Sequence, residues 1–212
     1  MGEILFPMVK CRPDISTRAI ILSQYMNKPG EVHYNALKQL LHYLTITKET
    51  GVHYWHKEPH QHLPDKPLPE QHSDNYQLIN KAATNSNKLI AFVDSDWATN
   101  MKAQNSMTGM VLMFAGGAIG YKSKFQPVIA HSSTEAEFVA ACDMAKMILF
   151  FRSLLEDVGI AQQDATILFE DNNGALMMAN AKQPTTSACW IGSNGISLFW
   201  RALKLRIMQQ MR

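Results

Sequence analysis

Two carboxylates follow directly on an apolar run near the middle of the chain. Residues 89–97 read Leu-Ile-Ala-Phe-Val-Asp-Ser-Asp-Trp, which is typical of a buried strand that ends in Asp94 and Asp96. Residues two apart on a strand share a face, so both side chains should project together. For a lone Asp-x-Asp the ordinary interpretation is a solvated turn or cap. A catalytic interpretation therefore needs further acids at the same place.

Two later elements place acids at comparable positions. Glu137 lies in the first turns of a long helix expected to begin near Ser132–Thr134, and Asp171 follows the apolar run 165–169. If the two strands are parallel neighbours linked by that helix, Asp94 and Asp171 become adjacent and Glu137 can reach them. Clustered carboxylates persist where a divalent cation offsets their charge, and oxygen ligands favour Mg²⁺ or Mn²⁺. Two such ions about 4 Å apart support phosphodiester cleavage.

Several motifs in this order carry a family resemblance. Val-Asp-Ser-Asp-Trp-Ala (93–98), His-Ser-Ser-Thr-Glu-Ala-Glu-Phe (131–138) and Glu-Asp-Asn-Asn (170–173) resemble the ribonuclease H domain of copia-type retrotransposon Pol polyproteins. Upstream, Lys-Cys-Arg-Pro-Asp-Ile (10–15) and the helical segment 33–44 resemble the part that joins that family's reverse transcriptase to its ribonuclease H. The resemblance spans the chain up to residue 186.

The resemblance implies a fold, a reaction and a set of site residues. The fold is α/β: a mixed, ribonuclease H-like sheet with covering helices. The activity is metal-dependent cleavage of the RNA strand of an RNA/DNA hybrid, with Mg²⁺ or Mn²⁺ as cofactor. The remainder of a Pol polyprotein is a further partner. The catalytic and metal-binding acids are Asp94, Glu137 and Asp171.

Other motif residues are expected to assist. Asp96 and Glu135 are supporting residues, although Glu135 is better explained as an acid at the helix start that faces the helix dipole. The candidates for contact with the nucleic-acid backbone are Lys122, Lys124 and Ser133, and solvated hairpin lysines are the alternative.

The chain divides into four expected parts. Residues 1–55 are a helical remnant of the reverse transcriptase thumb or connection, 56–88 a linker, 89–184 the ribonuclease H-like domain, and 185–212 an aberrant tail. The family continues with a strand and a helix that carries a fourth acid, whereas no Asp or Glu follows residue 182 here. The domain is therefore expected to be incomplete at its C-terminal end, and no polymerase activity is expected. The alternative function is an inactive retroelement remnant that at most binds nucleic acid or Pol fragments.

Local patterns add expectations about single elements. Asp14 is expected to cap a helix that runs to about residue 26, and 51–55 and 127–131 to form short strands. Residues 107–114 and 118–124 are expected to form a hairpin. Residues 196–211 fit a basic amphipathic helix, although a chance product of a shifted reading frame explains them better. The predicted linker carries four histidines, which a solvated loop explains better than a metal site: His56, His60, His62 and His72.

Composition is that of a globular protein, with 46% apolar residues, 18% charged residues and a net charge of +2. Three well-separated cysteines argue against a disulfide framework and favour a reducing compartment. We find no signal peptide and no membrane-spanning run, so an intracellular location, cytoplasmic or nuclear, is expected.

Overall fold

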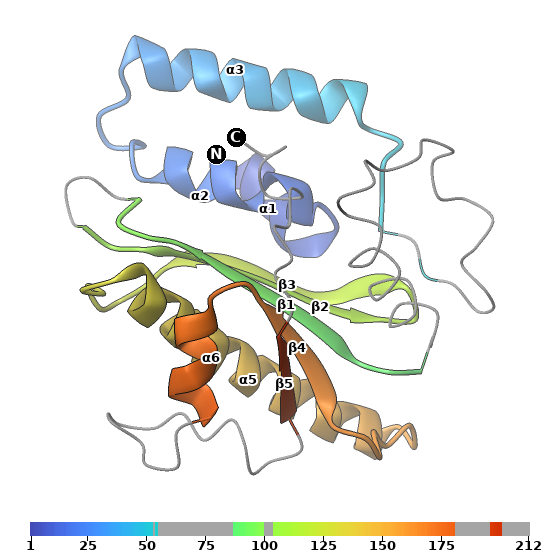
Figure 1. Cartoon of the computed structure of the whole chain (residues 1–212). Coiled ribbons are helices and arrows are strands. Elements are labelled where there is room, and N and C mark those ends of the chain that lie inside the picture. Colours follow the sequence, from blue (N-terminus) through green and yellow to red (C-terminus); the bar gives the residue numbers. More distant parts are fainter. Residues whose placement is uncertain (53, 55–86, 100–103, 181–195, 201–212) are drawn as a thin grey trace, which may run out of the picture.

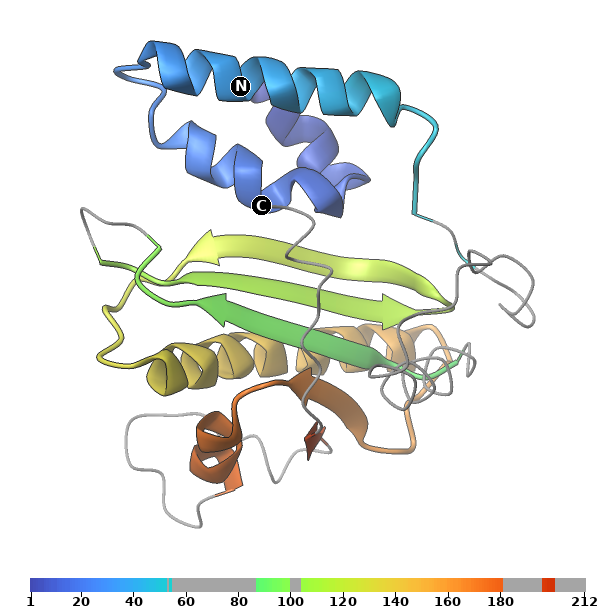
Figure 2. The ribbon, with the colours of Figure 1, turned by 45° about the horizontal axis from the view of Figure 1, so that its top comes forward.

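The computed structural model describes residues 1–52, 54, 87–99, 104–180 and 196–200. A central sheet separates two helical layers, which Figures 1 and 2 show from two directions. Helices α1–α3 lie on one side of the sheet, and α5 and α6 lie on the other. The predicted linker and histidines lie outside the described residues, apart from residues 87 and 88. No described helix is long and apolar enough to cross a membrane.

The sheet is mixed and has the strand order β3-β2-β1-β4-β5. Its strands are β1 (Ile90–Asp96), β2 (Met107–Phe114), β3 (Gly117–Phe125), β4 (Thr166–Glu170) and β5 (Ile196–Trp200). The first three pair antiparallel, whereas β4 runs parallel to β1 and β5 parallel to β4. The fold class and the parallel placement of the two acid-bearing strands are thus as expected from the sequence.

Helix α5 (Ser133–Asp157) forms the main core with the sheet, because small and apolar residues recur along one of its faces. Met144 and Ile148 are fully buried there against Leu112 and Leu168. The helix ends at Asp157; Val158 beyond it is 61% exposed, and Gly159 follows with a φ of 81°.

The N-terminal layer contains α1 (Gly2–Lys10), a 3₁₀ turn (Pro13–Ile15), α2 (Ser16–Ser23) and α3 (Glu31–Ile46). Its own small core consists of Ile4, Ile15, Ala19 and Leu40. Helix α2 lies against β3, where the hydroxyl groups of Thr17 and Ser123 are 3.4 Å apart. The layer therefore covers the face of the sheet that α5 leaves open.

Asp14 has a different role from the predicted helix cap. Its carboxylate accepts hydrogen bonds from the Arg12 guanidinium, at 2.6 Å, and from the Tyr43 hydroxyl, at 2.9 Å. The pKa of Asp14 is lowered because these donors outweigh the effect of its burial. Arg12 also donates to Thr47 at the end of α3, so this network ties the 3₁₀ turn to α3.

Two predicted strands are wrong. Residues 51, 52 and 54 are not in a strand; instead the Tyr54 hydroxyl donates to the carbonyl of Ala118. Residues 127–131 also form no strand, because the chain turns there from β3 into α5 and Pro127 has no N–H for a ladder. Val128 and Ile129 are consequently half exposed.

The C-terminal region supplies a strand where a missing strand or a basic helix was expected. Residues 196–200 form β5, paired in register with β4 from Thr166↔Ile196 to Glu170↔Trp200. The run Ile-Ser-Leu-Phe-Trp is short, apolar and aromatic, a composition that suits a strand once a free parallel edge such as β4 is available. The cysteine expectation also needs correction, since Cys142 is disulfide-bonded whereas Cys11 is free.

Candidate metal centre

The ends of β1 and β4 bring two aspartates together. The parallel ladder between these strands ends at the pair Phe92↔Phe169, whose rings stack at a centroid distance of 5.1 Å. Asp94 and Asp171 each lie two residues beyond this last pair. Because equal steps along parallel strands keep residues level, the two carboxylates meet at the carboxyl end of the sheet.

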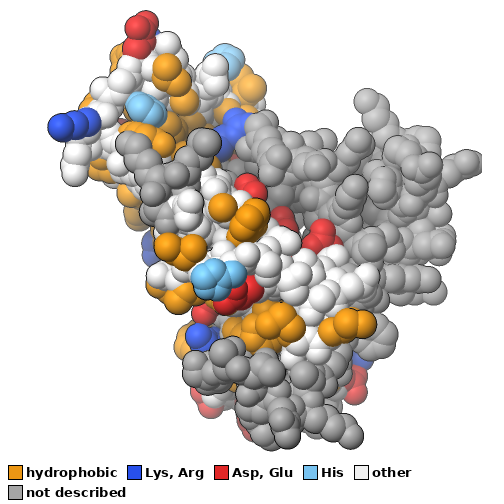
Figure 3. Space-filling model, turned by 60° about the vertical axis from the view of Figure 1, so that its left-hand side comes forward, with side chains coloured by type: hydrophobic (Ala, Val, Ile, Leu, Met, Phe, Trp, Pro, Cys, Tyr) orange, Lys and Arg blue, Asp and Glu red, His pale blue; other side chains and the backbone are white. Residues whose placement is uncertain are grey.

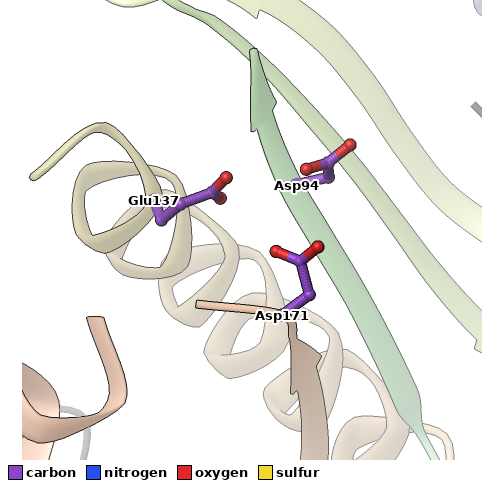
Figure 4. Close-up of side chains that lie close together, drawn as sticks. All are labelled: Asp94, Glu137 and Asp171. Carbon is purple, nitrogen blue, oxygen red and sulfur yellow. The ribbon is translucent and has the colours of Figure 1, made fainter. Parts of the chain in front are cut away.

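Helix α5 contributes the third carboxylate. Its first residue follows Ser132, whose hydroxyl accepts a hydrogen bond from the Glu135 N–H at 3.1 Å and so fixes where the helix begins. Glu137 lies one turn further on and is only 5% exposed. Oxygen atoms of Asp94, Glu137 and Asp171 all lie within 4.8 Å of one another. Figure 4 shows the three side chains arriving from β1, α5 and the end of β4 around one space.

A fourth carboxylate, Glu170, adjoins this group and was not singled out from the sequence. It is 5% exposed, and its Oε1 accepts hydrogen bonds from the backbone N–H groups of Asp171, at 2.9 Å, and Asn172, at 3.2 Å. Strand alternation could have revealed it: Leu168 packs against α5, and Glu170 is two residues further along β4. In the sequence the run Glu-Asp-Asn-Asn (170–173) contributed to the family resemblance, and only Asp171 was predicted from it as a metal ligand.

Two buried carboxyl groups of the centre have raised pKa values. Burial, reinforced by the nearby carboxylates of Glu170, Asp94 and Asp171, raises the pKa of Glu137 to about 10. Burial likewise raises the pKa of Glu170 to about 8, although the N–H groups of Asn172 and Asp171 oppose the rise. Like charges at this spacing cannot all ionise without a compensating positive charge.

These groups suit a divalent cation. Within the described part of the chain, Oε2 of Glu137 and Oε2 of Glu170 are both buried and accept no hydrogen bond. A buried carboxylate oxygen without a partner is costly, and a bound cation would remove that cost. The donor set consists of oxygen atoms alone, as Mg²⁺ and Mn²⁺ prefer. The geometry and the donors therefore fit the predicted metal.

The other predicted site residues differ in exposure and in their partners. Asp96 is exposed at the end of β1. The Glu135 carboxylate accepts a hydrogen bond from the N–H of His131 at 2.7 Å, just before the start of α5. Ser133 is exposed in the first turn of α5. Lys122 is exposed on β3, whereas Lys124 forms an ion pair with Asp143 of α5.

The buried side-chain amide of Gln126 links the elements that carry the acids. Gln126 is 1% exposed, and its Nε2 donates to the Thr108 hydroxyl at 2.9 Å and to the carbonyl of Ala136 at 2.8 Å. Ser95 lies at the edge of the same network, with its hydroxyl 3.4 Å from Nε2. Gln126 thus joins β1, β2 and the residue that precedes Glu137.

Exposed apolar groups border the acids. Trp97 is 50% exposed, and its indole N–H donates to the carbonyl of Ala130 at 3.0 Å. Figure 3, which brings the left-hand side of Figure 1 forward, shows acidic side chains, a histidine and apolar side chains next to one another on this face. Of the three acids, Asp171 is exposed, Asp94 is partly buried and Glu137 is buried, so the centre opens to the surface at Asp171.

The strand order and the acids together define the class. Strands β1, β2 and β3 pair antiparallel, and a long helix then leads to β4, which runs parallel to β1. Carboxylates lie at the ends of both parallel strands. This arrangement is a ribonuclease H-like fold. No family model matches the chain.

Known Pol polyproteins of transposons are similar in sequence to this chain. The chain is 25% identical over 181 residues to the retrovirus-related Pol polyprotein from transposon TNT 1-94 of Nicotiana tabacum, which covers 85% of this chain and 12% of that protein. It is 30% identical over 164 residues to the Pol polyprotein from transposon RE2 of Arabidopsis thaliana, covering 77% of this chain and 9% of that protein. Its homologues thus include retrovirus-related Pol polyproteins of copia-type transposons. It spans only about a tenth of the length of these two relatives.

Two further similarities complete the comparison. A secreted RxLR effector protein, number 161, of Plasmopara viticola is 30% identical over 140 residues, which is 66% of this chain and 80% of that protein. Among solved structures, LC11-RNase H1, isolated from compost, superposes with a TM-score of 0.34 and 18% identity, covering 47% of this chain and 67% of that one.

Proposed function

We propose that the chain acts as a metal-dependent ribonuclease H that cleaves the RNA strand of an RNA/DNA hybrid. One observation carries the proposal: three carboxylates from three elements lie within 4.8 Å of one another beside buried carboxylate oxygens that accept no hydrogen bond. Its setting is a ribonuclease H-like fold in a chain whose homologues include Pol polyproteins, and the remainder of a Pol polyprotein is its natural partner.

Each residue has a defined part in this proposal. Asp94, Glu137 and Asp171 would hold the divalent ion, and Glu170 adds a further buried carboxyl group near them. A bound Mg²⁺ or Mn²⁺ would lower the pKa of an attacking water and offset the charge that develops on the leaving oxygen. Such an ion would have to displace a proton from Glu137, because burial and like charge raise the pKa of that carboxyl group in the ion's absence.

Nucleic-acid contacts would come from the elements around the acids. Ser133 and Lys122 are exposed and can reach phosphates, whereas Lys124 must first leave its ion pair with Asp143. RNA differs from DNA by its 2′-hydroxyl groups, which a protein reads across the wide minor groove of the hybrid. The specificity for the RNA strand would rest on those groups.

The test is cleavage of an end-labelled RNA/DNA hybrid by the purified full-length chain with Mg²⁺. We expect cleavage of the RNA strand only, no cleavage of the matching DNA duplex, and loss of at least about 10²-fold in rate for Asp94→Asn, since the charge that holds the ion is removed. Glu156→Gln, a change of an exposed acid on α5, is the matched control and should retain the rate. Hybrid binding without any cleavage would instead favour the inactive remnant.

A further inference from the structure

The start of α6 (Asn173–Asn180) contacts the start of α5 beside the metal centre. Asn172 precedes α6, and its side-chain Oδ1 accepts hydrogen bonds from the N–H groups of Gly174, at 2.9 Å, and Ala175, at 3.1 Å. The Leu176 N–H bonds to the backbone carbonyl of Asn172 at 3.2 Å. Asn172 is therefore the N-cap of α6.

The same oxygen also accepts a hydrogen bond from α5. The Thr134 hydroxyl donates to Oδ1 of Asn172 at 3.3 Å. Thr134 lies three residues before Glu137 on α5, so the two share a face of the helix. Asn172 directly follows Asp171. One hydrogen bond thus joins the neighbour of one proposed metal ligand to the helix turn that carries another.

Gly174 allows this contact to be close. A Cβ atom at residue 174 would lie 2.7 Å from Cγ2 of Thr134 and 3.1 Å from both Oγ1 of Thr134 and Oδ1 of Asn172. Gly174 does not have a positive φ, unlike Gly116 and Gly159. Residue 174 must therefore be a glycine because a side chain has no space there, and not because of an unusual backbone conformation. An alanine would force α6 and the start of α5 apart.

The backbone around Asp171 is held from the other side as well. The Glu170 side chain accepts hydrogen bonds from the N–H groups of Asp171 and Asn172, so it holds the backbone of these two residues at the end of β4. The Thr134 contact holds Asn172 from the side of α5. Without it, Asp171 would still follow β4, but its distance from Glu137 would no longer be set.

We propose that Thr134, Asn172 and Gly174 form a latch that positions Asp171 against Glu137 for metal binding. The inference rests on the proposed metal centre and adds positioning residues that touch neither ion nor substrate. Partners of this indirect kind typically change metal affinity by 10- to 100-fold when they are altered.

A double-mutant cycle tests the latch in the full-length protein. Gly174→Ala should weaken Mn²⁺ binding, measured by calorimetry, by at least about 10-fold. Thr134→Ser removes Cγ2 and keeps the hydroxyl, so it should leave Mn²⁺ affinity near the original value. The double variant Thr134→Ser/Gly174→Ala should recover most of the affinity, because the closest clash has gone. Met177→Ala, on an α6 side chain that is 75% exposed, is the control and should have no effect.

Amide hydrogen exchange at Asp171 and Asn172, measured without metal, separates the latch from the metal proposal. Gly174→Ala should speed exchange there, and the double variant should restore it. Unchanged exchange in Gly174→Ala would overturn the latch. Faster exchange with unchanged Mn²⁺ affinity would overturn its positioning role. No Mn²⁺ binding by the unaltered protein, with the exchange response intact, would overturn the metal proposal and reduce the contact to a structural one.

Discussion

The buried glutamates give the metal-free protein an unusual dependence of stability on pH. The folded-state pKa of Glu137 is raised to about 10, against 4.5 for the free side chain, because the group is buried among other carboxylates. Between these values the folded state binds a proton that the unfolded state has released. The free energy of unfolding must therefore fall as pH rises through this window, and it is highest near or below pH 4.5.

The size of the effect follows from the linkage. One pH unit corresponds to about 1.36 kcal/mol for each proton held only by the folded state. From pH 5 to pH 8, Glu137 alone should lower the free energy of unfolding by on the order of 4 kcal/mol. Glu170, whose pKa is raised to about 8, adds to the fall over the lower part of the range. Asp14 and Asp143 do not interfere, because their lowered pKa values affect stability only below the ordinary aspartate value of 3.8.

The assay is urea unfolding in EDTA at a series of pH values. Glu137→Gln should reduce the slope, and Glu137→Gln/Glu170→Gln should nearly flatten it between pH 5 and 8, whereas the control Glu156→Gln should keep the original slope. Saturating Mg²⁺ should also reduce the slope, because the ion favours the deprotonated carboxylates. A flat or rising profile for the unaltered protein in EDTA, or an unchanged slope in the double variant, would refute the reasoning.

Two further predictions concern α5. Met144→Ala should lower the free energy of unfolding by about 2–5 kcal/mol, since the side chain is fully buried between α5 and the sheet, and a loss below about 1 kcal/mol in urea unfolding would contradict that packing. Ser132→Ala should cost about 1 kcal/mol through loss of the helix cap. The neighbouring change Ser133→Ala should leave stability unchanged but weaken hybrid binding in a fluorescence titration; equal stability losses for the two serines would show that the cap is misplaced.

The sequence contained most of the information about the acids at the strand ends. The apolar run before Asp94 and the one before Asp171 indicated buried strands. Their acids become neighbours if the strands are parallel and linked by the long helix, and β1 and β4 do pair in this way. The placement of Glu137 near the start of α5 followed from the hydroxyl cap at Ser132. These are local patterns with strong periodicity, so they can be recognised in the sequence without knowledge of the tertiary structure.

Other features depended on contacts between distant segments. Gln126 reads as a polar loop residue, yet three elements converge on it and bury it. Asp14 stands where a helix cap is ordinary, but Arg12 and Tyr43 compete successfully for its carboxylate. The strand 196–200 needs the free edge of β4, which no local pattern reveals. Such residues are decided by what the fold places beside them rather than by their own neighbours in sequence.

The most direct test of the central claim is the location of a bound ion. Crystals of the full-length protein grown with Mn²⁺ should give an anomalous difference peak about 2.1 Å from carboxylate oxygens of Asp94, Glu137 and Asp171. Crystals of Asp94→Asn under the same conditions should lose that peak. A fully occupied Mn²⁺ elsewhere on the molecule, or a peak at this position that persists unchanged in Asp94→Asn, would contradict the assignment of these three residues as the metal centre.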